Sequence, residues 1–93
     1  MNITVLTPDK EIFHGLVTSL KVPGTLGQFQ VLKNHAPIVA SLEAGMVYIV
    51  TAKGEFRYFH EESGTIKTED EAGKEISFMI NSGFVEVLNN EIS

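Results

Sequence analysis

The side chains that most often carry chemistry are few and widely spaced in this sequence. The histidines His14, His35 and His60 are 21 and 25 residues apart, so no close pair is available to hold a metal ion on one helix or hairpin. The acids at 61–62 and 69–71 resemble the carboxylate pairs of glycoside hydrolysis, but that reaction needs one acid buried enough to raise its pKa. Both groups lie in the most polar stretch, so a solvated hairpin is the better interpretation.

Other signatures of catalysis are missing from the sequence. The run Gly24-Thr25-Leu26-Gly27 lacks the Gly-Lys-Ser/Thr and the following helix of a phosphate-binding loop. There is no Gly-x-Ser-x-Gly elbow and no cysteine, which removes a thiolate nucleophile and any zinc site that needs sulfur. The sequence therefore predicts neither an enzyme nor a metal site, and no cofactor is expected.

The charge balance excludes one class of partner. Seven basic and twelve acidic side chains give 7 − 12 = −5, so a nucleic acid or an anionic lipid surface would be repelled. Four of these five excess charges lie between Glu55 and Glu75. The remainder is nearly neutral, so an interaction surface elsewhere need not be charged.

Length and hydropathy predict a single domain over residues 1–93. A chain of 93 residues that is 43% hydrophobic fills one core and folds alone. No stretch approaches the ~20 apolar residues that span a bilayer, and the first residues lack a secretory signal. We expect a cytosolic protein whose membrane association, if any, depends on a partner.

The turn formers recur at intervals short enough for an all-β fold. Apolar residues alternate with polar ones over residues 2–6, 18–22 and 75–81, as in strands with one buried face. The unbroken apolar run over 46–50 predicts a central strand covered on both faces. Residues 38–44 are the best helical candidate and span only two turns, so helix is nearly excluded.

The middle of the chain predicts two hairpins. Lys53-Gly54 fits a tight turn in which glycine supplies a positive φ. Residues 55–60 then form a strand with one mixed face. Residues 61–74 are charged, contain two glycines and predict an exposed hairpin.

Two blocks of sequence carry a family resemblance. Residues 22–50, VPGTLGQFQVLKNHAPIVASLEAGMVYIV, and residues 81–87, NSGFVEV, resemble the epsilon subunit of the F-type proton-translocating ATP synthase. The matching positions include Val22-Pro23-Gly24, Gly27, His35-Ala36-Pro37, Gly45 and Gly83-Phe84-Val85-Glu86-Val87. The resemblance implies an all-β, flattened two-sheet β-sandwich of about ten short strands. Periodicity favours a sandwich independently, but it does not select this family.

The resemblance also implies a function and partners. It implies a non-catalytic subunit of the central stalk, or rotor, that couples proton-driven rotation of the c-ring to ATP synthesis. The expected partners are the gamma subunit and the c-ring. The expected location is the cytoplasmic side of the inner membrane, where the protein is peripheral and membrane-associated through the complex.

The family's contact residues carry over by position. His35, with Ile38 and Ala40 and with Thr7 on the adjoining turn, is expected at the gamma subunit. Pro37 biases the preceding residue toward extended geometry, so the segment around His35 has a backbone explanation as well.

A second set of residues faces the c-ring in the family. Gln28 and Phe29 stand where relatives carry an acid, so the resemblance implies a c-ring contact through an amide and a ring, with weaker salt dependence than an ion pair. For Phe29, a place in the core is an equal alternative.

One family feature is not expected here. Many members carry a C-terminal helical hairpin, which inhibits ATP hydrolysis and in some members binds ATP. This sequence stops at Ser93. We therefore do not carry over inhibition or nucleotide binding.

Two functions of other classes stay open. The aromatic side chains of Phe56, Tyr58 and Phe59, with the acids at 61–62, would suit a sandwich that binds a sugar or another small ligand, provided that at least two of the rings are accessible. An enzyme with His35 as a general base beside Glu43 ranks third.

Overall fold

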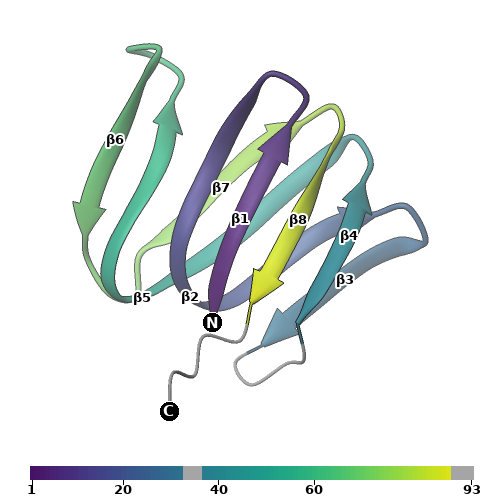
Figure 1. The fold of residues 1–93 in the computed structure, drawn as a ribbon, viewed down its shortest axis with the longest axis horizontal. Helices are drawn as coiled ribbons and strands as arrows, with labels where there is room; N and C mark the ends of the chain where they lie inside the picture. Colours follow the sequence, from purple (N-terminus) through teal and green to yellow (C-terminus); the bar gives the residue numbers. More distant parts are fainter. Residues whose placement is uncertain (33–36, 89–93) are drawn as a thin grey trace.

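The computed structural model describes residues 1–32 and 37–88, and these residues form strands and turns without a helix. The all-β prediction is confirmed. The eight strands (Figure 1) are β1 (Asn2–Thr7), β2 (Lys10–Gly24), β3 (Gly27–Leu32), β4 (Ile38–Leu42), β5 (Gly45–His60), β6 (Thr65–Asp70), β7 (Glu75–Ile80) and β8 (Gly83–Leu88).

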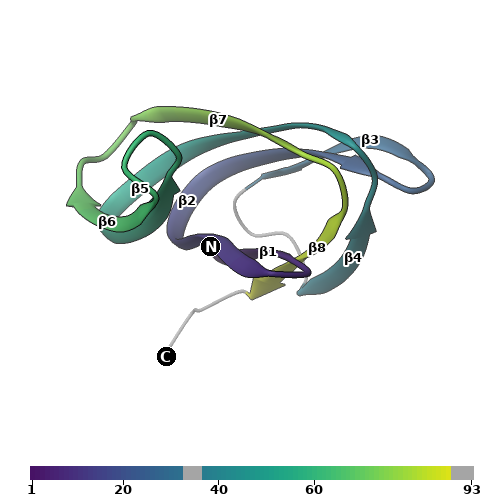
Figure 2. The same cartoon turned by 90° about the horizontal axis from the view of Figure 1, so that it is seen from above.

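The strands form one hydrogen-bonded network that folds over on itself. Their order is β1-β8-β4-β2-β5-β6, with β3 paired to β2, β7 paired to β5 and β1 paired to β2 as well. Figure 2 shows the result: β1, β8 and β4 form one layer, and β7 with parts of β5 and β2 forms the other. The molecule is flat, with extents of 35 × 32 × 19 Å.

Two long strands explain why eight strands stand where about ten short ones were expected. β2 has 15 residues and β5 has 16, and the two halves of each strand pair with different neighbouring strands. The first part of β2 pairs with β1, and the last part pairs with β3. The first part of β5 pairs with β7, and the last part pairs with β6.

The hairpin predicted at Lys53-Gly54 is wrong. β5 runs through this point without reversing, although Gly54 does adopt a positive φ of 131°. The pairing with β2 resumes beyond it, with Gly15 opposite Phe56 and Phe13 opposite Tyr58. A glycine with positive φ allows a bend as readily as a turn, and here the continued pairing with β2 keeps the strand going.

The hairpin predicted over residues 61–74 is displaced. Residues 61–68 are exposed, as expected. However, the hairpin consists of the last part of β5 and of β6, with the turn at 61–64. We call this unit the β5–β6 hairpin.

The core lies between the two layers. The segments predicted by period two supply Ile3, Val5, Leu20 and Val22, all buried. The strand over 46–50 is central, between β2 and β7, as predicted. Only one of its faces is fully covered, contrary to expectation, because Tyr48 on the other face has 44% of its surface exposed. The other buried apolar residues are Phe13, Val17, Val31, Leu42, Val47, Ile49, Phe56, Ile80, Val85 and Val87.

Candidate functional site

The turn after β1 holds the first residue predicted to contact a partner. Thr7 is half-buried, and its Oγ1 donates a hydrogen bond of 3.3 Å to the carbonyl of Lys10. Between these two residues, Pro8 and Asp9 are exposed. Thr7 thus stabilises the short turn that joins the end of β1 to the start of β2.

β4 carries two more of the predicted residues, with their side chains turned inward. Ile38 and Ala40 are half-buried and pack against the core, whereas Val39 and Ser41 point outward. His35, the fourth residue expected at the same partner, lies outside the described residues. The predicted set therefore follows one strand and one turn, without forming a compact cluster.

β3 carries the two residues expected at the second partner. Gln28 is exposed. Phe29 is half-buried, packs against the core, and has its ring so close to Gly24 that an added Cβ there would lie 2.6 Å from the ring. Phe29 therefore supports the β2–β3 turn, while Gln28 is presented to solvent.

A groove of about 440 Å³ brings one residue of the first predicted set, Ala40, next to the second set. It is lined by the β2–β3 turn and by β4, and includes Gln28, Phe29 and Ala40. Leu26, at the tip of the turn, is fully exposed, and Val39 is 71% exposed. Exposed apolar side chains around a groove are typical of an interaction site.

The outward surface of β1, β8 and β4 is a feature that the motifs did not single out. We call it the contact face. Val39, Phe84 and Leu88 are 71%, 46% and 42% exposed, and the register aligns Leu6 of β1 with Phe84 of β8. Period two could have found it, because the inward Val85 and Val87 require their neighbours to face outward.

The contact face carries polar side chains as well as apolar ones. Thr4 Oγ1 lies 2.8 Å from His14 Nδ1, and Glu86 stands opposite Thr4 and Val39 in the register. The polar Thr4, Ser41 and Glu86 thus stand among exposed apolar side chains, and these apolar side chains suit packing against another protein.

The aromatic residues proposed for a sugar site are engaged within the protein. Phe56 is 1% exposed and stacks on Phe13 at 5.7 Å. Tyr58 and Phe59 are half-buried, and the Lys10 ammonium lies 4.1 Å from the Phe59 ring centre. Of the three rings, Phe56 is closed off in the core, whereas Tyr58 and Phe59 are partly exposed and line a groove, so the small-ligand alternative stays a prediction.

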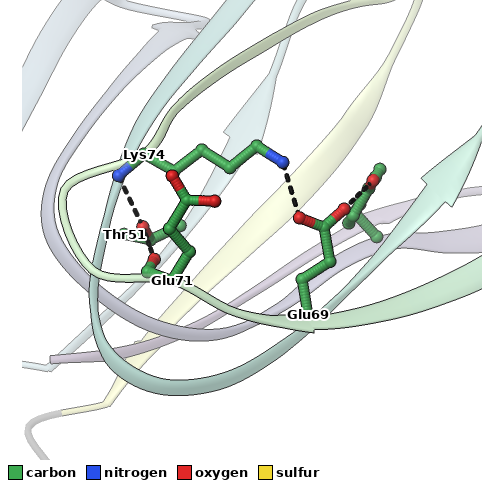
Figure 3. Close-up of polar contacts among 5 residues, drawn as sticks. Thr51, Glu69, Glu71 and Lys74 are labelled. Carbon is green, nitrogen blue, oxygen red and sulfur yellow. Dashed lines mark hydrogen bonds and ion pairs between the residues drawn. The ribbon is translucent and has the colours of Figure 1, made fainter.

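A polar cluster holds the turn between β6 and β7 (Figure 3). The buried Thr51 donates through its Oγ1 to the carbonyl of Glu71 and accepts from the backbone N–H of Lys74 at 2.9 Å. The Lys74 ammonium donates to Glu69 at 2.6 Å, and the Tyr58 hydroxyl donates to the other oxygen of Glu69.

These contacts shift the pKa values of the three titratable groups. The hydrogen bonds from Lys74 and then Tyr58 lower the pKa of Glu69. The same bonds raise the pKa of Lys74 and of Tyr58 above their ordinary values. All three groups thus favour the protonation states they hold at neutral pH, which suits a structural clamp.

Two further observations bear on the kind of site. Across residues 1–32 and 37–88, the histidines and acids nowhere gather in threes as a metal ion would require. In the same ranges, no helix is long and apolar enough to cross a membrane.

Fold and surface together define a small β-sandwich domain with apolar contact surfaces. Residues 1–72 match the family described as ATP synthase, Delta/Epsilon chain, beta-sandwich domain. Because this match covers more than half of the chain, the chain belongs to the ATP synthase delta/epsilon family.

Its relatives include several proteins named ATP synthase epsilon chain. The one from Leptospira borgpetersenii serovar Hardjo-bovis is 42% identical over 71 residues, which are 75% of this chain and 54% of the relative. The one from Chlorobium limicola is 37% identical over 89 residues, 96% of this chain and 80% of the relative. The one from Salinibacter ruber is 28% identical over 94 aligned residues, all of this chain and 55% of the relative. The chain thus spans between about half and four fifths of the length of these relatives.

Proposed function

We propose that this chain is a non-catalytic subunit of the central stalk of an F-type ATP synthase. In this role it braces the gamma subunit against the c-ring, so that proton-driven rotation is transmitted to the sites of ATP synthesis. Family membership and the epsilon-chain relatives support the assignment. The protein would sit on the cytoplasmic side of the inner membrane, held there by the complex.

The proposed mechanism is mechanical. A subunit that transmits torque must resist shear, and a closely packed interior has low compressibility. Here the sheet folds back so that β1 pairs with both β2 and β8, which ties the two layers together at one side. A flat body 19 Å thick suits a place between two neighbours.

The exposed apolar side chains of the contact face are the observation that carries the proposal. We assign it to the gamma subunit, with Val39 and Phe84 as central contacts. Thr7, Ile38, Ala40 and His35 stay proposed contacts: Thr7 at one end of the face, and Ile38 and Ala40 beneath Val39 on β4. A contact that lasts through rotation needs an interface of at least ~1,200 Å² with an apolar centre.

The β2–β3 turn is assigned to the c-ring. Gln28 and the fully exposed Leu26 would contact the ring, with Phe29 supporting the turn from below. None of these side chains is charged, so binding to an isolated c-ring should depend only weakly on salt.

Co-expression with the gamma subunit of the same organism tests the proposal. We expect the two proteins to elute together at micromolar concentration. The double variant Val39→Glu/Phe84→Glu should weaken binding by about 100-fold or more, because it buries charge at the centre of the interface. Ile66→Glu is the matched control, since Ile66 is 53% exposed on β6, away from the contact face, and should leave binding unchanged. Separate elution of the wild-type proteins would exclude the stalk assignment.

A further inference from the structure

Two edge strands, β6 and β7, lie next to β5, and their free edges differ in charge. Within the described residues, β6 and β7 each pair with β5 alone. β6 carries Lys67, Glu69 and Asp70, and such charges keep an edge strand from pairing with another chain. Between Ile76 and Ile80, β7 has no charge, no proline and no bulge. The edge of β7 is therefore open to a further strand.

A groove of about 440 Å³ follows this edge. One wall is β7, with Ile76 and Phe78, and the other is the end of the β5–β6 hairpin, with Tyr58 and His60. A second groove of about 490 Å³ shares Phe59, Glu61 and Met79 with the first and continues to the β1–β2 turn. Together they offer a channel along β7 in which aromatic and apolar side chains lie beside polar ones, among them Asp9, Lys10 and Asn81.

The charge around the channel selects the occupant. Glu61 and Glu62 are exposed at its border, and Asp9 and Lys10 line its second groove, so acids outnumber bases there. The ion pairs found among the described residues, Arg57–Glu11 and Lys74–Glu69, involve none of these four. A second copy of this chain would bring the same carboxylates, and a net charge of −5, against themselves. A basic segment would be attracted instead.

We propose that the β7 edge binds an extended segment of another protein in which apolar residues alternate with lysine or arginine. Main-chain hydrogen bonds to residues 76–80 would supply affinity. The apolar side chains would lie on Phe78 and Tyr58, and the basic ones would reach Glu61 and Glu62. β7 belongs to the layer opposite the contact face (Figure 2), so this inference does not rest on the proposed stalk function.

The test uses a blocked eight-residue peptide of alternating valine and lysine as the probe. Titrated into the isotopically labelled chain, it should shift the backbone NMR signals of residues 76–80. It should also slow, by about tenfold, the hydrogen exchange of the alternate amides in this range that face away from β5. Two N-methylated peptides provide the control for geometry. One is methylated on the amides that face β7 and the other on the alternate amides, and only the first should lose binding.

Variants of the chain give a second readout. Met79→Lys, which puts a lysine on the open edge, should abolish binding. Glu62→Lys should weaken binding about threefold, whereas Glu43→Lys, the same charge change in the exposed β4–β5 turn, should not. Equal binding of both methylated peptides would overturn the proposal. Signal changes confined to β3 and β4, or self-association of the free chain through β7, would overturn it too.

Discussion

The contact face and the β5–β6 hairpin are both turned to solvent in the isolated chain, but they are built on different principles. The contact face exposes Val39, Phe84 and Leu88, and Glu86 is the one charged residue on its three strands as described. The hairpin exposes charges, and two of its charged residues have partners: Arg57 lies 3.2 Å from Glu11, and Glu69 lies 2.6 Å from Lys74. The hairpin is therefore suited to water, whereas the contact face gains free energy only when another protein covers it.

A substitution at the junction between the hairpin and the sandwich should have the largest effect on stability. Phe56 is the one buried side chain of the hairpin, and it stacks on Phe13 of β2. Phe56→Ala should lower the free energy of unfolding by about 3–5 kcal/mol, because it leaves a cavity in the core. Urea unfolding measures this change.

Ile66→Ala is the control on the same hairpin. Ile66 stands opposite Phe59 on β6 and is 53% exposed, so its loss should change stability by no more than about 0.5 kcal/mol. Equal losses of stability in Phe56→Ala and Ile66→Ala would contradict the view that Phe56 anchors an otherwise solvated hairpin.

The turn between β6 and β7 offers a smaller and more local effect. Thr51→Val keeps the volume but leaves the carbonyl of Glu71 and the N–H of Lys74 without their partner. The expected loss is about 1–3 kcal/mol, with faster hydrogen exchange at the Lys74 amide. Thr18→Val is the matched control: Thr18 is exposed and its Oγ1 donates to Val50 at 3.4 Å, so little should change.

The sequence predicts the inward residues well and the course of the strands less well. Alternation identifies Ile3, Val5, Leu20 and Val22 because a strand with one buried face must repeat every second residue. It does not reveal that β5 continues past Gly54. That outcome depends on pairing with β2, a contact between segments far apart in the sequence.

The candidate site shows the same limit. The family motif locates Gln28 and Ala40, which the fold brings to one groove. It does not say which side chains of a strand face outward, so it selects Ile38 and Ala40, whereas the exposed residues of β4 are Val39 and Ser41. Only the register of β4 with β8 unites Val39 and Phe84 in one face.

The smallest effect concerns pH, and it sharpens the contrast because the hairpin relies on charge where the contact face does not. The pKa of Glu69 is lowered from its ordinary value of 4.5, so its contribution to stability is present above pH 4.5 and is lost as the pH falls through the lower, folded value. The pKa values of Tyr58 and Lys74 are raised from 10.0 and 10.5, so their contributions are present below those values and are lost at higher pH.

Glu69→Gln should therefore reduce the urea midpoint slightly between pH 4.5 and pH 10.0, and the difference from wild type should disappear on either side of that window. Because the pair is partly exposed, added salt should shrink the difference as well. Glu62→Gln, which removes an exposed carboxylate outside the ion pairs found in residues 1–32 and 37–88, should show no such window. If the urea midpoint of Glu69→Gln stayed below that of wild type by the same amount at pH 2, Glu69 would support the fold through packing and not through its charge. The hairpin would then resemble the contact face more than its charges indicate.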